Sequence, residues 1–338
     1  MYKKTLSNCR ILVTPTTFGK KDPMLKATLK AVAGEVIYNP FARPLKAADL
    51  YPLIKDVDGY IAGVDEVDAS VIQAAKRLKM IARYGVGIDR VDIAAATERG
   101  IVVTNSPGAN SVAVAELTIG LMLALARNIC AANEAIRRGE WPALDGVGLK
   151  GKTIGIIGFG AVGKEVALRL KGFSCRLLAF DPYIQLDIAE KFHVKMVSLE
   201  DVLSQADFVT LHVPVLPSTA GMVNHRFLGA MKPGAFLINT ARGELIDEEV
   251  LIAALKKGHL RGTALDCFSE EPPDKDNPLL SFPQVIVTPH TGAHTDEAIS
   301  RMGWISMENC LAVLRGERPP NVVNPEVYEK HHNEECHV

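Results

Sequence analysis

The stretch KTIGIIGFGAVG, residues 152–163, decides the fold of a large part of this chain. Its apolar first half is typical of a buried strand, and three glycines follow in G-x-G-x-x-G spacing, at Gly158, Gly160 and Gly163. The first glycine permits a tight turn, the second lets the backbone approach a pyrophosphate, and the third lets the next helix pack on the strand. The N–H groups and the dipole of that helix would face the anion. The motif therefore predicts a strand, a turn and a helix that bind a dinucleotide.

A carboxylate at the end of the next predicted strand indicates which dinucleotide. The strand covers Arg176–Phe180, and Asp181 follows it directly. An acid at this place accepts hydrogen bonds from the hydroxyls of the adenosine ribose and repels a 2′-phosphate. Because Pro182 and Tyr183 follow, and not an arginine, the sequence favours NAD over NADP as the cofactor. The alternative is a glycine-rich turn beside a surface aspartate, with no ligand.

Short apolar runs alternate with amphipathic segments on both sides of this motif. Before it, we expect strands at residues 10–14, 35–38, 59–62, 80–83 and 101–103, with helices at 23–33, 49–54, 69–75 and 91–99. After it, we expect further strands at residues 195–196, 208–211, 235–239, 262–265 and 285–287. Asp68 and Asp89 are expected to cap two helices at their N-termini, and Gly34 and Gly100 are expected to follow the ends of two helices. The alternation predicts an α/β fold with two doubly wound parallel-sheet domains.

Two long helical segments flank the second series of strands. The first, residues 111–129, is apolar nearly all round but carries Glu116 and Arg127. Because a charge inside a bilayer is costly, we expect this helix to be buried in protein. The second covers residues 296–314. We therefore expect an inserted domain at residues 105–295, within a discontinuous domain made of residues 1–104 and 296–338.

The composition of the 338 residues excludes several classes of partner. Lys and Arg number 38 and Asp and Glu 39, so the chain lacks the net positive charge of most nucleic-acid and membrane-surface binders. The six cysteines form no C-x-x-C pair, and the N-terminus shows no apolar signal region, so we expect a cytoplasmic protein. A polar tail with His331, His332, Cys336 and His337 matches no zinc spacing, and we expect no metal site there.

Three side chains at predicted strand ends, and one in a loop nearby, could carry chemistry, because ligands of a doubly wound sheet bind beyond the carboxyl ends of its strands. Arg242, Asp266 and His290 each follow a strand, and Glu271 lies in the loop after Asp266. A guanidinium binds a carboxylate in two directions, and an imidazole takes and returns a proton near neutral pH. A carboxylate beside the imidazole fixes its tautomer. Taken singly, each could be an ordinary ion-pair, loop or strand-end residue; together they suggest oxidation of a 2-hydroxy acid.

These motifs together resemble the family of D-isomer-specific 2-hydroxyacid dehydrogenases, and its phosphoglycerate dehydrogenase-like branch most closely. The resemblance extends from Ile11 to about Asn321. It rests on the glycine motif, on NTARG at residues 239–243, on LDCFSEEP at 265–272 and on TPH at 288–290. It also includes RYGVGID at residues 83–89 and SVAVAE at 111–116.

The resemblance implies a role for each of these residues. Arg242 would bind the substrate carboxylate, His290 would be the general acid and base, and Glu271 its partner acid. Asp266 would anchor the nicotinamide carboxamide, and Asp181 the ribose. The cofactor would also contact Gly158, Gly160, Ala161, Val162, Gly163, Val213, Thr240, Ala241, Arg242, His290, Gly292 and Ala293. The substrate would also contact Arg83 and the backbone N–H groups of Val86 and Gly87.

The resemblance also implies how the chain is organised and what it does. The discontinuous domain would be a flavodoxin-like substrate domain, the inserted one a Rossmann NAD domain, and two chains would form a homodimer around the helix after residue 110. The activity would be NAD-dependent hydride transfer on a small 2-hydroxy or 2-keto acid, most closely that of a phosphoglycerate dehydrogenase. The alternatives are a hydroxypyruvate or glyoxylate reductase, and a non-enzymatic NADH-sensing scaffold like the corepressors of this fold.

The chain departs from the phosphoglycerate dehydrogenase pattern at one place. These enzymes commonly carry an arginine after the third strand, where it meets the substrate phosphate. Here residues 60–66 read YIAGVDE, with acids and no base. A phosphate would need Arg83, Arg43 or Lys46 in its place, or a cation from a partner chain.

Overall fold

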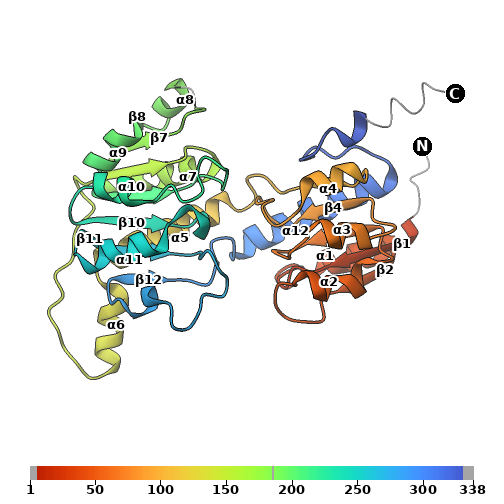
Figure 1. Cartoon of the computed structure of the whole chain (residues 1–338), viewed down its shortest axis with the longest axis horizontal. Helices are drawn as coiled ribbons and strands as arrows, with labels where there is room; N and C mark the ends of the chain where they lie inside the picture. Colours follow the sequence, from red (N-terminus) through yellow and green to blue (C-terminus); the bar gives the residue numbers. More distant parts are fainter. Residues whose placement is uncertain (1–5, 185, 330–338) are drawn as a thin grey trace. The chain divides into compact units, whose positions relative to one another are not determined.

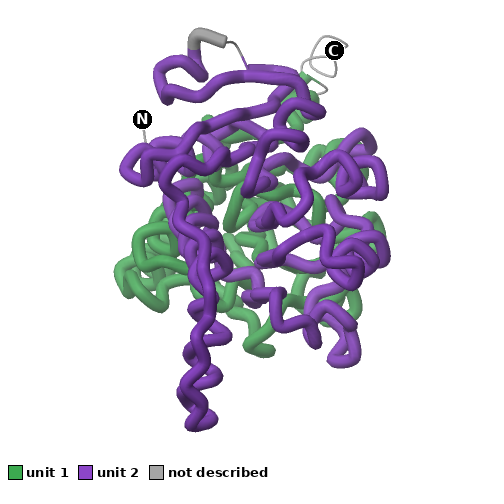
Figure 2. Tube along the Cα trace, turned by 90° about the vertical axis from the view of Figure 1, so that its left-hand side faces the viewer, with its two compact units in different colours: residues 1–110, 294–338 green, residues 111–293 purple. Residues whose placement is uncertain are grey.

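The computed structural model describes residues 6–184 and 186–329. The chain divides into two compact units: unit 1 holds residues 1–110 and 294–338, and unit 2 holds residues 111–293 (Figure 2). The expected domain boundaries, at 104/105 and 295/296, lie a few residues from this division. The polar tail with its histidines is outside the described residues. Within the described ranges, no group of three or more His, Cys, Asp or Glu side chains is placed to hold a metal ion.

Unit 1 contains a five-stranded parallel sheet in the order β2-β1-β3-β4-β5. The chain reverses direction across the sheet between β1 and β3, which is the flavodoxin-like form of the doubly wound fold. Its strands are β1 (Leu6–Val13), β2 (Ala33–Tyr38), β3 (Gly59–Ala62), β4 (Met80–Arg83) and β5 (Val102–Thr104). Its helices are α1 (Pro23–Val32), α2 (Ala47–Ile54), α3 (Ala69–Ala74), α4 (Ile93–Glu98) and α12 (Asp296–Arg315). Helix α12 returns from the far end of the chain and packs on β3 and β4 (Figure 1).

Of two local expectations for unit 1, one was wrong and one was confirmed. Asp68 does cap α3, but α4 is capped by Asp92, whose side chain accepts from the backbone N–H of Ala95 at 2.9 Å, and not by Asp89. The reason is a bridge between Val67 and Val91, which keeps the backbone extended until Asp92. Gly34 follows Ala33, the C-cap of α1, as expected; it is also the second residue of β2, where a Cβ would lie 2.0 Å from the carbonyl oxygen of Ser7 on β1.

Unit 2 contains a seven-stranded parallel sheet in the order β12-β11-β10-β9-β6-β7-β8. The chain reverses direction between β6 and β9, as in the Rossmann fold. Its strands are β6 (Thr153–Ile157), β7 (Arg176–Phe180), β8 (Lys195–Met196), β9 (Phe208–Leu211), β10 (Ala235–Asn239), β11 (Leu260–Leu265) and β12 (Val285–Val287). Its helices are α5 (Ser111–Ala126), α6 (Ile129–Arg137), α7 (Ala161–Leu170), α8 (Leu186–Glu190), α9 (Leu199–Gln205), α10 (His225–Ala230) and α11 (Glu248–Lys256), with short 3-10 turns at Lys171–Phe173, Gly243–Leu245 and Pro278–Ser281.

Apolar residues cover both faces of this sheet. Neighbouring residues of a strand point to opposite faces, so Ile156 packs with Met122 of α5 and Val166 of α7, whereas Ile157 packs with Leu251 of α11. A parallel sheet needs this double cover because both of its faces are apolar. The predicted α/β class, with two doubly wound parallel sheets, is confirmed.

The apolar segment after residue 110 forms two helices and not one. Helix α5 ends at Ala126, and α6 begins at Ile129 after Asn128, whose φ of +52° lies outside the helical region. Most residues of α5 are buried within the protein, as the sequence predicted. Among the described residues, no single helix is long and apolar enough to cross a membrane; α5 and α6 pass that test only as a pair, which is bent by 62°.

Candidate active site

The glycine turn of unit 2 joins β6 to α7 and fits a pyrophosphate. Gly158 has φ +91°, and a Cβ there would lie 2.5 Å from the carbonyl oxygen of His212, so glycine is required. A Cβ on Gly163 would lie 2.3 Å from the carbonyl oxygen of Gly158, so this glycine lets α7 approach the turn. At Gly160, by contrast, no atom lies within 4 Å of the Cβ position. The backbone N–H groups of Ala161, Val162 and Gly163 meet no hydrogen-bond partner among the described residues and are available to an anion.

Asp181 is tied to the same turn from the end of β7. Its Oδ2 accepts from the backbone N–H of Phe159 at 2.8 Å, and its Oδ1 accepts from that of Tyr183 at 2.9 Å. These two bonds hold the carboxylate beside the glycine turn, where each oxygen keeps a lone pair for a further donor. This is the carboxylate from which the sequence predicts a contact with an adenosine ribose.

The loop after β9 closes the other side of the glycine turn. The backbone N–H of His212 donates to the carbonyl oxygen of Ile157 at 2.7 Å, and the side chain of Val213 lies next to Gly158. The Nε2 atom of His212 is 3.0 Å from the hydroxyl of Thr210. Burial lowers the pKa of His212 from 6.5 to about 3, so this ring is neutral at physiological pH.

The end of β10 presents Arg242 through an ordered loop. The side chain of Asn239 donates to the carbonyl oxygen of Arg242 at 2.7 Å and accepts from the backbone N–H of Ala241 at 3.0 Å. Thr240 is 2.8 Å, oxygen to oxygen, from Thr118 of α5, which anchors the loop to a buried helix. The Nη1 of Arg242 donates to the carbonyl oxygen of Ala241 at 2.8 Å.

Asp266, directly after β11, orders the loop that carries His290. Its carboxylate accepts from the hydroxyl of Thr288 and from the backbone N–H groups of Thr291 and Gly292, at 2.5, 2.9 and 2.8 Å. Its carbonyl oxygen accepts from the backbone N–H of His290 at 2.8 Å. With 2% of its surface exposed, Asp266 is a buried carboxylate with many donors, and the loop after β12, including Ala293, is built around it.

His290 and Glu271 form the pair that the sequence predicted. The Nδ1 atom of His290 is 2.9 Å from both Oε1 and Oε2 of Glu271. The backbone of His290 has φ +51°, an uncommon conformation for a residue with a side chain, and the Asp266 contacts stabilise it. A carboxylate that accepts a hydrogen bond from Nδ1 favours the tautomer with the proton on Nδ1. The Nε2 atom is then available to exchange a proton with a ligand.

Three of these charged groups influence the buried thiol of Cys267. The thiol is buried, and burial together with the carboxylates of Asp266 and Glu271 raises its pKa, while the charge of Arg242 lowers it in part. Arg242, Asp266 and Glu271 thus all act on the same buried side chain. The structure therefore brings Arg242, Asp266, Glu271 and His290 together at the carboxyl edge of the unit 2 sheet, as expected from the strand ends.

The predicted substrate residues of unit 1 lie at the carboxyl edge of that unit's own sheet. Gly85, with φ +146°, opens a turn after β4 that contains Val86 and Gly87. The backbone N–H groups of these three residues donate to no other described residue. Arg83, the last residue of β4, is 3% exposed, and it donates to the backbone carbonyl oxygens of Gly87, in the turn, and of Ala62, at the end of β3.

Sequence reasoning missed the side chains that support the site. Thr118 and Thr291 were not singled out, and Thr288 was quoted only as part of the TPH motif, although each holds a loop that carries a predicted site residue. Thr118 and Thr240 are separated by 122 positions, so no local pattern connects them. The threonines near His290 could have been found, because a buried strand-end aspartate such as Asp266 needs donors nearby.

Comparison with known proteins identifies the chain. The fold and the glycine turn define a dinucleotide-binding protein of the doubly wound α/β class. A family model described as "D-isomer specific 2-hydroxyacid dehydrogenase, NAD binding domain" matches residues 119–292. The chain belongs to the D-isomer specific 2-hydroxyacid dehydrogenase family, and its second unit contains the NAD-binding domain of that family.

Individual relatives cover most of the chain. It is 45% identical to a D-3-phosphoglycerate dehydrogenase of Methanocaldococcus jannaschii, over 93% of this chain and 59% of that protein. It is 40% identical to a glyoxylate reductase of Thermofilum pendens, over 88% of this chain and 91% of that protein. The crystal structure of the TT0316 protein from Thermus thermophilus matches with a TM-score of 0.83 and 40% identity, over 93% of this chain and 99% of that one. The chain thus spans less than two thirds of the phosphoglycerate dehydrogenase it matches.

Proposed function

We propose that this chain is an NAD-dependent dehydrogenase that interconverts a small D-2-hydroxy acid and the corresponding 2-oxo acid. The observation that carries the proposal is the His290–Glu271 pair, with both oxygens of the carboxylate 2.9 Å from Nδ1. This pair lies at the same edge of the same sheet as a glycine turn that fits a pyrophosphate. An acid–base group beside a dinucleotide site is the arrangement that oxidation of an alcohol requires.

In the proposed reaction, each residue has one task. The chemistry that bound NAD supplies is the acceptance or return of a hydride at the substrate C2. Nε2 of His290 takes the hydroxyl proton during oxidation and gives it back during reduction, while Glu271 holds the ring in the required tautomer. Arg242 binds the substrate carboxylate through its planar guanidinium. Asp266 holds the loop of His290 through the contacts described above. It is also predicted to contact the nicotinamide carboxamide.

The turn after β4 supplies a second group for the substrate carboxylate. Successive backbone N–H groups without a partner form an anion-binding concavity, and those of Val86 and Gly87 fit this description among the described residues. We assign unit 1 the role of substrate domain on this ground.

A second candidate substrate class, unphosphorylated 2-oxo acids such as glyoxylate and hydroxypyruvate, is favoured by the side chains around this edge. Of the three cations that could replace the missing phosphate-binding arginine, Arg43 donates to both oxygens of Asp49, at 2.8 and 3.2 Å. Arg83 is buried and donates to carbonyl oxygens. Only Lys46 of the three is exposed without an ion pair in the described part of the chain. A phosphoglycerate dehydrogenase would need more positive charge than this at the phosphate.

The deciding experiment is a panel of 2-oxo acids with NADH, followed by absorbance. The panel contains 3-phosphohydroxypyruvate, hydroxypyruvate, glyoxylate and pyruvate, each with the wild type and with His290→Ala. We expect turnover with at least one acid and a loss of about 10²-fold to 10⁴-fold in kcat for the variant, the range for a general acid–base group. NADH binding, measured by fluorescence, should be unchanged in the variant. No turnover with any acid, with NADH still bound, would favour a non-enzymatic NADH-sensing scaffold.

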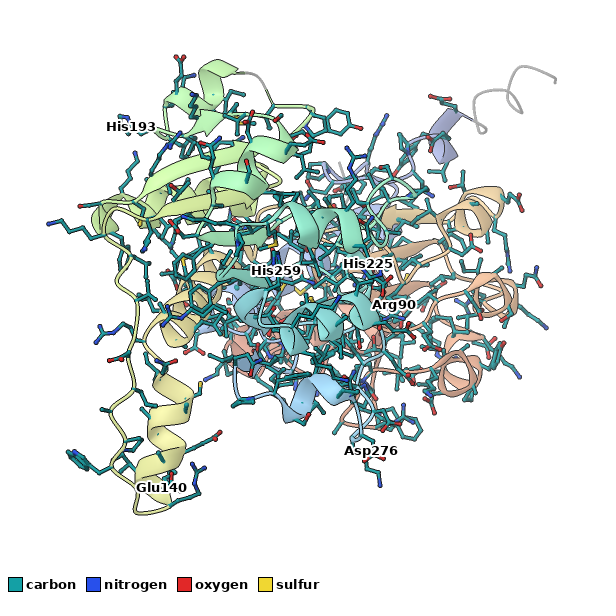
Figure 3. The ribbon with its side chains drawn as sticks, turned by 60° about the vertical axis from the view of Figure 1, so that its left-hand side comes forward. Arg90, Glu140, His193, His225, His259 and Asp276 are labelled. Carbon is teal, nitrogen blue, oxygen red and sulfur yellow. The ribbon has the colours of Figure 1, made fainter. Side chains whose placement is uncertain are left out.

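The assembly and the location follow as further parts of the proposal. Helix α6 and the segment after it project from unit 2 (Figures 1 and 2), with Glu140 at the tip (Figure 3). This projection exposes Ile129, Ile136 and Trp141, the last at 91% of its surface, as expected for a contact with a second copy in a homodimer. We place the protein in the cytoplasm, because no disulfide forms among the cysteines in the described part of the chain.

A further inference from the structure

The turn after β4 keeps its shape because each of its three carbonyl groups accepts a hydrogen bond from a residue outside the turn. The carbonyl oxygen of Gly85 accepts from the backbone N–H of Ser106 at 2.8 Å, and that of Val86 accepts from the side-chain amide of Asn105 at 2.9 Å. The carbonyl oxygen of Gly87 accepts from Nε of Arg83 at 3.0 Å. All three carbonyl groups of the turn are therefore held, while its three N–H groups donate to nothing else in the described ranges.

Arg83 connects this turn to the neighbouring strand. While Nε binds the carbonyl oxygen of Gly87, Nη1 donates to the carbonyl oxygen of Ala62, the last residue of β3, at 2.8 Å. The planar guanidinium presents its donors in fixed directions, so one side chain spans both acceptors. Only 3% of Arg83 is exposed, and a buried cation must be hydrogen-bonded to be tolerated. The backbone of Arg83 is held as well, because its carbonyl oxygen accepts from the hydroxyl of Ser106 at 3.2 Å.

We propose that Arg83 is a positioning residue, which fixes the turn at Gly85–Gly87 so that its backbone N–H groups bind the substrate carboxylate. This inference rests on the proposed function, because it assigns the turn to the substrate. It differs from the role that the family resemblance implies for Arg83, which is contact with the substrate. The guanidinium acts through the carbonyl oxygen of Gly87, and the backbone N–H groups of the turn meet the anion.

The two roles predict different effects when Arg83 is replaced. Arg83→Lys keeps the charge, but a single ammonium group does not reproduce the two fixed directions, and Arg83→Gln removes the charge. If Arg83 positions the turn, both variants loosen it even without substrate. The amide of Ser106, which donates to Gly85, should then exchange its hydrogen faster in both variants. If Arg83 only contacts the substrate, exchange at Ser106 without substrate should be unchanged.

Kinetics separate positioning from a general loss of structure. A looser turn weakens binding of the carboxylate equally in the ground state and the transition state, so KM rises and kcat is retained. We expect KM for the best 2-oxo acid to rise about tenfold or more, the size expected for loss of a hydrogen bond to a charged group, with kcat within about threefold. The dissociation constant for NADH should not change.

Arg99 provides a matched control in the same unit. Its guanidinium also binds backbone carbonyl oxygens, those of Ile72, Gln73 and Ala75, at 2.7, 2.9 and 3.2 Å. These carbonyls end α3, away from the turn. Arg99→Lys should leave both KM and exchange at Ser106 unchanged.

Each possible result either supports or overturns the positioning role of Arg83. A higher KM with faster exchange at Ser106, absent in Arg99→Lys, supports the inference. A higher KM with unchanged exchange, or an unchanged KM, overturns it, as does failure of both Arg83 variants to fold when Arg99→Lys folds. A wild type that turns over none of the 2-oxo acids refutes the proposed function instead, and that result precedes any comparison of variants.

Discussion

The orientation of His290 shows how much of the site depends on single residues. Its backbone conformation, with φ +51°, is held by a hydrogen bond to the carbonyl of Asp266 and by neighbours that bind the Asp266 carboxylate. Its ring is held by Glu271. An acid–base group must keep its geometry within hydrogen-bond reach of the reacting proton, and here two acids from the β11 loop supply that control.

Asp181 is expected to decide between the two nicotinamide cofactors. Asp181→Ala removes the ribose acceptors and the negative charge that repels a 2′-phosphate. We expect binding of NADH to weaken about tenfold to a hundredfold and the preference for NADH over NADPH to decrease by at least as much. Steady-state kinetics with both cofactors measure this. An unchanged preference would contradict the ribose contact.

His212 is expected to make the stability of the protein depend on pH. Its folded pKa of about 3 lies below the unfolded value of 6.5, so the unfolded chain binds more protons between these values. The neutral ring therefore contributes stability that is complete above pH 6.5 and is lost as the pH falls. At pH 5, the loss in the free energy of unfolding should be about 2 kcal/mol.

Denaturant unfolding at pH 8 and pH 5 tests this. The difference between the two pH values should be about 2 kcal/mol smaller in His212→Gln than in the wild type. Equal differences in the two proteins would mean that His212 is protonated in the folded state at pH 5.

At the scale of elements, the loops after β10 and β11 are packed directly against each other. Gly243 follows Arg242, and a Cβ there would lie 1.9 Å from the carbonyl carbon of Phe268 and 2.2 Å from the backbone nitrogen of Ser269. The loop that carries Arg242 therefore lies directly on the loop that carries Glu271. Neither backbone segment can move without displacing the other.

Gly243→Ala should separate these two loops. We expect it to lower the free energy of unfolding by about 1–3 kcal/mol, as overpacking does. We also expect it to lower kcat/KM, because the loops that carry Arg242 and Glu271 would no longer be held in the same relative position. Gly229→Ala in α10 is the control, since no atom lies near its Cβ position and alanine favours a helix. Thermal unfolding and steady-state kinetics of the two variants measure the effects. Full activity in a stable Gly243→Ala protein would refute the coupling.

The sequence predicted the elements well where the signal was local. Asp68 caps a helix, and the strands of both sheets lie within a few residues of their expected positions. The start of α4 was wrong because a bridge between Val67 and Val91, distant in sequence, overrides the local preference of Asp89. The break between α5 and α6 depends on the left-handed backbone of Asn128, a residue that the periodicity of apolar positions does not distinguish.

At the scale of the whole molecule, the projection formed by α6 and the segment after it is expected to carry the contact between two chains. Trp141→Glu places a charge on its most exposed apolar residue and should convert a dimer to a monomer. Light scattering after gel filtration should give twice the chain mass of 36.6 kDa for the wild type and that mass for the variant.

A substitution at an exposed aromatic residue outside the projection provides the control for this test. Tyr183 is similarly exposed, at 87%, but lies on the loop after β7, so Tyr183→Glu should remain dimeric. A measured mass of 36.6 kDa for the wild type, which is that of a single chain, would contradict this assignment of the interface. A Trp141→Glu protein that remains dimeric would contradict it as well.

The succession of strands and helices along the chain, the cofactor turn and the Arg242, Glu271 and His290 set were all readable from the sequence, because each depends on residue types at short spacing or at a strand end. The tertiary structure alone decided what holds them. The donors around Asp266, the contact of Thr118 with Thr240 and the bonds of Arg83 to Ala62 and Gly87 join different elements. Such contacts form only when apolar burial has packed the elements together, because a buried polar group must then find a partner among whichever residues the fold brings near.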